Sequence, residues 1–568
     1  MPKHYLVAVL LCTVQAYVLA AVGTACAEDQ VAPPVGQTIP TPEAVAAPAP
    51  AASETVQPVS PSPAPGSAQP AAAPSSQQPP PAAETALPSP ADPVLAAIRA
   101  KLADPDLRKG ANADDLAALE AFYGTRTGGP LWMTEMGFSA KGQQVLFEIE
   151  KADDWGLDAT AFELPPADAL PTSQEARAIT EIKLDLAILK YARFARGGRF
   201  NPPELSKLFD QTPPLCDPKT ALTEIAAADV PDVYLRSLHP QHEQFMRLRQ
   251  ALLKAHGDGG EGGKPAGNDR DIRRIIINME RWRWMPEDLG SLYVWNNSPE
   301  FMLYVVKDGK PIYADKTLVG TIGYATPVFT ADMKTIVFNP DWVAPETVVT
   351  ENLLPPLREG SYSILKIHKL SVSYNGTPID PTRVDWGRVN ILNYTFSQRA
   401  GPDNVLGKVK FLFPNKHTVY MHDTLQVRRK YFKQPVRMIG HECVRMEKPE
   451  QFADVLLAAD KGWSASQVRD LWDKGVNSPV SLDGKIPVHM TYFTAVVDET
   501  GKVSTFADVY GLDNKMATAL FGNATGFPMP PPEAKQPPTE EADASSPANK
   551  RTAGDNDIAG SLGGFAGD

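Results

Sequence analysis

The spacing of apolar residues is helical over residues 93–256. The stretch DPVLAAIRAKLAD at its beginning opens with an Asp-Pro pair, which favours a helix start. Residues 173–198 give the clearest helix, because apolar side chains return every three or four positions until two glycines end the run. Its predicted apolar face consists of Ile179, Ile182, Leu186 and Leu189. We therefore predict a helical domain with Trp132 and Trp155 in its core.

After residue 271 the apolar spacing changes to two, which is typical of strands. The stretch FMLYVVKDGKPIYADKTLVG alternates on both sides of Asp308 and Gly309, which predicts a β-hairpin with a two-residue turn. Further strands are expected in VFNPDWVAP, KVKFLFPNKHTVYMHD and IPVHMTYFTAVVDETGKVSTF, and helices at 449–460 and 464–475. The predicted fold class is α+β, with a mostly β domain at 271–525 after the helical one.

Three segments lack an apolar period. Residues 28–92 are dominated by Ala, Pro, Ser and Gln. Such a composition cannot bury enough apolar surface to offset the ordering entropy, so we predict a disordered and extended linker. A Gly-rich hinge is predicted at 257–270 between the two domains, and a disordered tail at 526–568.

The first residues, MPKHYLVAVLLCTVQAYVLAAVGTACAED, combine a short basic start with an apolar stretch and small residues. Ala25-Cys26-Ala27 fits the small-x-small cleavage pattern, so a signal peptide at 1–27 is expected. An uncleaved anchor and a lipoprotein acylated on Cys26 are the alternatives. With the signal peptide, the mature chain is predicted to be exported.

Charge and cysteine content narrow the possible functions. The formal net charge is −12 and the sequence pI is about 5.4, which argues against nucleic acid as a partner, since such proteins carry a basic stripe or domain. Cleavage of the signal peptide leaves only Cys216 and Cys443. This pair could form a disulfide in an oxidising compartment, or Cys443 could be a free thiol kept for its chemistry.

Candidate chemistry is concentrated in MIGHECVRM, residues 438–446, where Cys443 follows His441 and Glu442. His422, at the end of a predicted strand, is a possible general base, and Asp423 could orient it through its carboxylate or its backbone carbonyl. A thiol becomes a nucleophile when an adjacent cation lowers its pKa. The alternatives are a buried structural thiol and a zinc corner, although the spacing lacks a second Cys/His pair.

Five further stretches of the chain are distinctive: NMERWRWMP, LVGTIGYATPVF, IVFNPDW, AGPDNVLGKVKFLFPNKHTVYMHDT and, in the helical part, LKYARFARGGRFNP. They resemble the L,D-transpeptidase family, in particular its large periplasmic Gram-negative branch. The family signature is a His, a variable loop, then Ser/Thr-His-Gly-Cys, a hydrophobic residue, and Arg or Asn. Here it reads His422, a loop, and GHECVR at 440–445. The peptidoglycan-binding module found in many relatives is not expected, because the Gly-rich hinge occupies its place.

The resemblance implies a helical scaffold domain followed by a mostly β catalytic domain with a lid-like insertion at about 346–395. It implies a periplasmic enzyme that cross-links peptidoglycan stem peptides through an acyl-enzyme on a cysteine and expels D-alanine. Outer-membrane proteins are an alternative acceptor, and neither a cofactor nor a metal is expected.

The resemblance also implies a role for each site residue. The implied assignments are Cys443 as nucleophile, His422 as base, His441 beside the thiol, the backbone of Glu442 and Cys443 as oxyanion donors, and Arg445 as a substrate-binding or structural residue. Trp342 and Tyr420 are further candidates for lining the cleft.

Two positions depart from the signature. Gly440 replaces Ser/Thr, and Glu442 replaces the glycine before the nucleophile. If that glycine needs a positive φ, a glutamate there is strained, and its carboxylate would raise the pKa of the thiol. A catalytically weakened cell-wall-binding scaffold is therefore the alternative to an active enzyme. The loop between the two halves of the motif is basic, which suggests either a solvated surface or attraction of carboxylate-rich peptides.

Overall fold

The computed structural model describes residues 92–257, 269–522 and 527. The predicted signal peptide, almost all of the predicted linker and most of the predicted hinge and tail lie outside these residues. Within the described part, no helix has both the length and the apolar character required to cross a bilayer.

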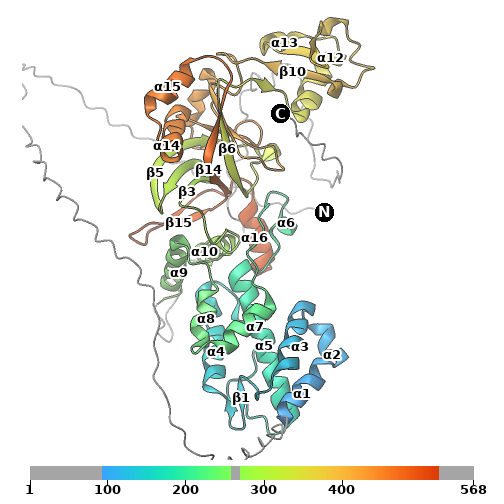
Figure 1. The fold of residues 1–568 in the computed structure, drawn as a ribbon, viewed down its shortest axis with the longest axis vertical. Coiled ribbons are helices and arrows are strands. Elements are labelled where there is room, and N and C mark those ends of the chain that lie inside the picture. Colours follow the sequence, from blue (N-terminus) through green and yellow to red (C-terminus); the bar gives the residue numbers. More distant parts are fainter. Residues whose placement is uncertain (1–91, 258–268, 523–526, 528–568) are drawn as a thin grey trace, which may run out of the picture. The chain divides into compact units, whose positions relative to one another are not determined.

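The first described region is helical, as predicted (Figure 1). Its helices are α1 (Pro93–Leu102), α2 (Pro105–Gly110), α3 (Ala113–Thr125), α4 (Ala140–Glu150), α5 (Gln174–Gly197), α6 (Pro202–Leu205), α7 (Pro218–Ala227), α8 (Pro231–Ser237) and α9 (Glu243–His256). A small hairpin of β1 (Met133–Thr134) and β2 (Gly137–Phe138) joins α3 to α4. The Asp92 carboxylate caps α1 by accepting from the N–H groups of Val94 and Leu95. Trp132 and Trp155 are buried, which confirms their predicted core positions.

The predicted face of α5 is partly wrong. Ile182 and Leu189 are buried, but Ile179 is 40% exposed. The buried face of α5 includes Ala178 in place of Ile179, and it contains two carboxylates, Glu181 and Asp185. An apolar pattern could not reveal this face, because two of its members are acidic.

The second region is built around a closed barrel whose strand order is β11-β12-β13-β5-β4-β3-β14-β6. Its strands are β3 (Leu292–Asn297), β4 (Met302–Lys307), β5 (Lys310–Leu318), β6 (Phe329–Phe338), β11 (Val409–Leu412), β12 (Met421–His422), β13 (Val444–Met446) and β14 (Ser478–Thr491). The predicted hairpin is confirmed: β4 and β5 meet at Asp308 and Gly309, whose φ angles are 50° and 75°. The two predicted helices are present as α14 (Pro449–Lys461) and α15 (Ala465–Asp473).

A segment with its own small core interrupts the barrel between β6 and β11. Its elements are β7 (Trp342–Val343), α11 (Glu346–Val348), the π-helix Val349–Leu353, α12 (Leu354–Arg358), α13 (Ser363–Ile367), β8 (Ser371–Tyr374), β9 (Thr377–Pro378) and β10 (Tyr394–Gln398). Leu353, Trp386 and Phe396 are among its buried residues. This segment lies where the lid-like insertion was expected, and Figure 1 draws α12, α13 and β10 together in yellow.

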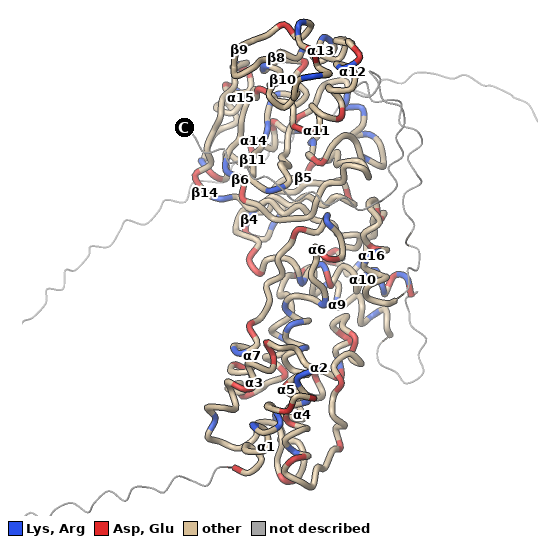
Figure 2. Tube along the Cα trace, turned by 90° about the vertical axis from the view of Figure 1, so that its right-hand side faces the viewer, with Lys and Arg blue, Asp and Glu red and all other residues tan. Residues whose placement is uncertain are grey.

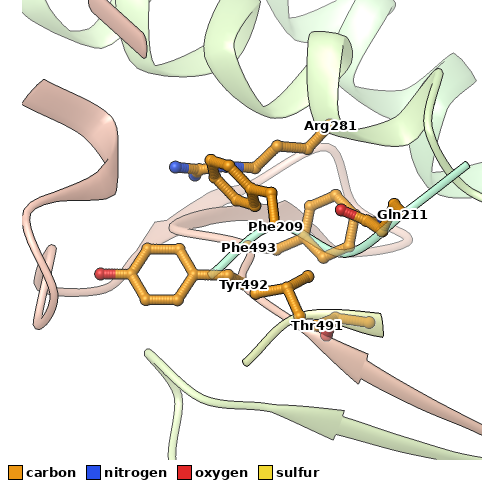
Figure 3. Close-up of a pocket in the computed structure, with 7 residues that line it drawn as sticks. Phe209, Gln211, Arg281, Thr491, Tyr492 and Phe493 are labelled. Atoms are coloured by element: carbon orange, nitrogen blue, oxygen red, sulfur yellow. The ribbon is translucent and has the colours of Figure 1, made fainter. Parts of the chain in front are cut away.

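A loop that follows α6 attaches the helical region to the barrel. The N–H of Asp210 donates to the carbonyl of Val328 at 2.8 Å, and the N–H of Val328 donates to the carbonyl of Leu208 at 2.7 Å. The Asp210 carboxylate also contacts Nε2 of His417 at 2.8 Å. In Figure 3 the same loop contributes Phe209 and Gln211 to a narrow crevice.

The far side of this crevice comes from α10 (Asp269–Trp282) and the end of β14. The Arg281 guanidinium lies 5.0 Å from the ring centroid of Tyr492 and 5.9 Å from that of Phe209. One of its nitrogens donates to Asp513 at 2.6 Å, so charge pairing and ring contacts hold this junction together.

The acidic pair on α5 is a buried proton-binding cluster. The Tyr123 hydroxyl lies within hydrogen-bond distance of both carboxylates, 2.9 Å from Glu181 and 2.7 Å from Asp185. Trp132 Nε1 donates to Asp185 at 2.7 Å. Burial raises the pKa of Glu181 to about 7. Burial and the adjacent Glu181 raise the pKa of Asp185 well above its ordinary value.

Because both carboxyl pKa values are raised on folding, this pair binds more protons in the folded state than in the unfolded state. The contribution of the pair to the free energy of unfolding is therefore expected to fall as pH rises from about 4 through 7, by on the order of 2 kcal/mol between pH 5 and 8. Asp185→Asn, which mimics the protonated acid, should reduce this slope in urea unfolding followed by tryptophan fluorescence. A pH slope equal to that of the wild type in this variant would contradict the assignment.

Candidate active site

The candidate site is built on one pair of parallel strands. β12 and β13 pair with Met421 beside Val444 and His422 beside Arg445, and the N–H of Val444 donates to the carbonyl of Tyr420 at 3.2 Å. Met421 and Val444 are fully buried in the barrel core. Side chains alternate across a strand, so the residues on either side of these two face away from that core.

The alternation brings four predicted site residues to one face. His422 lies on β12, and Tyr420 directly precedes that strand. Arg445 lies on β13, and Cys443 directly precedes it, so the side chains of all four project to the same face. Ring contact is direct within the first pair, since the centroids of Tyr420 and His422 are 5.7 Å apart. Residues from two chain segments 21 positions apart therefore meet on a single surface.

Cys443 is a half-buried free thiol. Burial raises its pKa to about 11, and the neighbouring Glu442 carboxylate acts in the same direction. Tyr420 and Arg445 oppose these effects and lower the thiol pKa. The sulfur thus has one acidic neighbour, one cationic neighbour and one phenol.

Tyr420 and Trp342 are in contact at this face. Burial and the Cys443 sulfur raise the pKa of the Tyr420 hydroxyl, while a hydrogen bond with the Trp342 side chain lowers it. Trp342 lies on β7 and packs against the small core of the insertion. The two aromatic residues expected near the cleft therefore connect the thiol to the base of the insertion.

His422 is buried, and burial lowers its pKa well below the ordinary histidine value. Arg445 and Arg428 lower the pKa of His422 further, while backbone groups of Asp423 and Leu406 raise it. A neutral imidazole can accept a proton, and only the neutral form can act as a general base.

The Asp423 carboxylate is directed away from His422. It accepts from the N–H of Lys408 at 2.9 Å, from the N–H of Thr424 at 2.7 Å and from the Arg429 guanidinium at 2.6 Å. Of the two orienting roles expected for Asp423, its side chain is occupied elsewhere, and its backbone is the part that acts on His422.

His441 lies against an aromatic ring. Its ring stacks on Tyr324, with centroids 4.1 Å apart and planes inclined by 22°. The Tyr324 hydroxyl donates to the Glu351 carboxylate at 2.6 Å. Tyr324 was not among the predicted site residues, and its stacking on His441 links the signature histidine to the insertion.

The two departures from the signature have different backbone consequences. Gly440 is in the left-handed region, with φ = 83°, and a Cβ there would come within 2.7 Å of the Arg445 guanidinium. Glu442 is absent from the non-glycine residues with positive φ in the described part of the chain. The left-handed glycine of this segment is thus at 440, and Glu442 carries no strain of that kind.

Arg445 is buried, and its guanidinium donates to the carbonyl of Ile439 at 3.0 Å. This hydrogen bond ties the loop that contains His441 and Cys443 to β13. Arg445 therefore has a structural contact in addition to its electrostatic effect on both Cys443 and His422.

The basic loop after β12 has two parts. Arg437 donates to the carbonyls of Thr317 and Phe301, and Arg429 to the Asp423 carboxylate, so these two are structural. Lys430 and Lys433 are exposed. Figure 2 shows basic and acidic positions interspersed along the trace rather than gathered in one band.

Sequence reasoning missed a second loop, residues 319–326, which is hydrogen-bonded along the segment 437–442. The N–H of Val319 donates to Arg437, the N–H of Thr321 to Gly440 at 3.1 Å, and the Thr326 hydroxyl to the carbonyl of Glu442 at 2.8 Å. Gly320 permits this close approach, because a Cβ there would lie 1.9 Å from the carbonyl oxygen of Tyr324. In the sequence, this loop was marked only by the stretch LVGTIGYATPVF, which resembles the family but does not indicate which residues the loop contacts.

Cys216 and Cys443 are both free thiols, so the disulfide alternative is wrong for this structure. The described residues contain no group of three or more His, Cys, Asp or Glu side chains that could hold a metal ion.

Comparison with known proteins agrees with this architecture. Residues 117–252 match the model of a scaffold domain, and residues 291–480 match that of the L,D-transpeptidase catalytic domain. A curated Haemophilus influenzae protein named "Putative L,D-transpeptidase" is 32% identical over 260 residues, which cover 45% of this chain and 51% of that protein. The chain thus aligns with about half the length of this relative.

The two matched segments coincide with the helical region and with the barrel and its insertion. The match to the catalytic domain includes both His422 and Cys443. We conclude that this protein combines a scaffold domain with a catalytic domain of the L,D-transpeptidase family.

Proposed function

We propose that this protein is a cysteine-dependent transpeptidase that cross-links peptidoglycan stem peptides. The observation that supports the proposal most directly is the shared face of β12 and β13, where His422, Cys443 and Arg445 meet inside a matched catalytic domain. The acyl donor would be a tetrapeptide stem, and the acceptor an amine of a neighbouring stem. The N-terminal sequence is the basis for placing this activity in the periplasm.

In the first step the Cys443 sulfur bonds to the carbonyl carbon of the diamino acid, and its proton passes to His422. Collapse of the tetrahedral adduct breaks the peptide C–N bond, and D-alanine leaves with the proton that His422 returns. The second step reverses the roles: an acceptor amine attacks the thioester, a new amide forms and the thiol is restored. Backbone N–H groups at Glu442 and Cys443 are the proposed oxyanion donors.

The charge states favour a general-base route. The thiol has its pKa raised to about 11 and the His422 pKa is well below normal, so at neutral pH both groups are uncharged. Proton transfer therefore accompanies attack, rather than preceding it as in a preformed thiolate–imidazolium pair. Arg445, close to both groups, would stabilise negative charge as it develops on the sulfur.

Attachment of an outer-membrane protein to peptidoglycan uses the same donor chemistry and remains the alternative for the acceptor. The scaffold alternative is favoured by one feature, the Glu442 carboxylate that raises the thiol pKa. The other argument for the scaffold alternative was backbone strain at Glu442, but Glu442 does not have a positive φ. The balance therefore favours an active enzyme.

Cys443→Ala should abolish formation of cross-linked dimers from purified tetrapeptide muropeptides, a loss on the order of 10³-fold or more, because the acyl-enzyme cannot form. Cys216→Ala is the matched control, since it removes the other free thiol of the described residues, which lies 227 positions earlier in the chain, and it should retain activity. Equal product from Cys443→Ala and the wild type would refute the cysteine mechanism.

Below its pKa of about 11, the alkylation rate of Cys443 by iodoacetamide should rise about tenfold per pH unit, because the thiolate is the reactive form. Glu442→Gln removes a charge that raises the thiol pKa, so this variant should react faster at any fixed pH below 10. Glu447→Gln, which leaves the Cys443 environment unchanged, is the control. An unchanged rate in Glu442→Gln would show that the carboxylate does not act on the sulfur.

The acceptor can be identified from sacculi of a deletion strain by mass spectrometry of muropeptides. Loss of stem–stem cross-links formed through the diamino acid is expected. If only the protein–glycan linkages disappear, the acceptor is an outer-membrane protein and the cross-linking role is wrong.

A further inference from the structure

The Thr326 hydroxyl is fully buried and has a defined hydrogen-bond direction. It accepts from the N–H of Gly320 at 3.0 Å and lies 2.8 Å from the carbonyl oxygen of Glu442. A hydroxyl has a single proton to donate. Since Gly320 is the donor in the first contact, the Thr326 proton is directed to Glu442.

The Glu442 carbonyl belongs to the same peptide unit as the N–H of Cys443. This unit is planar and trans, so its C=O and N–H point in opposite directions. A hydrogen bond that holds the carbonyl toward buried Thr326 therefore turns the Cys443 N–H away from Thr326 and out of that buried layer.

From this geometry we infer that Thr326 is a positioning residue, which aims the N–H of Cys443 at the oxyanion of the acylation step. The inference rests on the proposed function, and it names a residue outside the signature that sets up the oxyanion donor. Glu442 lies outside the left-handed region. The direction of its carbonyl is thus fixed by a hydrogen bond and does not require a glycine.

A buried network holds Thr326 from behind. The Tyr510 hydroxyl donates to the carbonyl of Gly320 at 2.8 Å and accepts from the N–H of Thr326 at 3.3 Å. The N–H of Tyr510 donates to the Tyr492 hydroxyl at 2.8 Å, which in turn donates to Asp508 at 2.7 Å. Each member has a partner on both sides, so Thr326 has little freedom to turn.

The network reaches the junction shown in Figure 3. Asp508 accepts from the N–H of Asp513 at 3.0 Å, and Asp513 is the partner of Arg281. The hydrogen bonds thus run without a break from the helix before the barrel to the peptide that precedes the catalytic sulfur. The position of Thr326 is therefore set by the core rather than by the surface.

Thr326→Val and Thr326→Ser separate positioning from other effects. Valine keeps the shape and removes the donor, whereas serine keeps the hydroxyl. Two rates are measured on the full chain by intact mass: acylation of Cys443 by a carbapenem, which needs the oxyanion donor, and alkylation by iodoacetamide, which does not. In acylation the sulfur bonds to the lactam carbonyl carbon, the ring C–N bond breaks and the nitrogen takes the proton.

Thr326→Val should slow acylation about 10- to 100-fold and leave alkylation unchanged. A backbone N–H that points away from the oxyanion loses part of the rate enhancement that would be lost if the donor were removed altogether. Thr326→Ser should acylate close to the wild-type rate. Thr491→Val is the matched control: Thr491 is also buried and its hydroxyl donates to a backbone carbonyl, that of Asn296 at 3.0 Å, which is not a member of this network. It should acylate at the wild-type rate.

Wild-type acylation in Thr326→Val would overturn the inference and leave the proposed function intact. Equal slowing of both reactions in that variant, or equal slowing of acylation in Thr491→Val, would also overturn it, because a general structural effect would then explain the loss. Absence of any adduct on the wild-type chain would overturn the proposed function, and the inference with it.

Discussion

The parallel pairing of β12 with β13 is the constraint on which the site depends. A register in which Met421 faces Val444 buries both in the barrel core and directs Tyr420, His422, Cys443 and Arg445 to the opposite face of the strand pair. A shift of one residue in either strand would bury that strand's polar pair and expose its apolar residue. Burial of apolar side chains in the barrel core therefore fixes the arrangement of the candidate site residues.

The surroundings of the thiol depend on two regions outside the barrel, the helical scaffold region and the insertion. The scaffold region contributes a loop that bonds to Val328, and Val328 ends the segment containing Tyr324 and Thr326. The insertion contributes Trp342 beside Tyr420 and Glu351 beside Tyr324. Contacts from both neighbours converge on residues 440–443, so folding of the helical region and of the insertion is coupled to the geometry around the sulfur.

Sequence patterns were most informative where one physical rule acts alone. The hairpin at Asp308 and Gly309 and the Asp92 cap were predictable because turn and capping chemistry are local. The face of α5 was not, because Glu181 and Asp185 are buried through hydrogen bonds to Tyr123 and Trp132, dozens of positions earlier. In the site, Cys443 and His422 could be named from the motif, whereas Thr326, Tyr324 and Tyr510 could not, since their contacts are long-range.

The sequence by itself determined the α+β order of the regions, the nucleophile candidate and the departure from the signature at Glu442. Tertiary structure decided what that departure means. The direction of one peptide unit depends on a hydroxyl 116 positions earlier in the chain, and the pKa of the thiol depends on its burial and on the neighbouring Tyr420 and Arg445. Both are set by packing between distant segments, which local residue chemistry cannot specify.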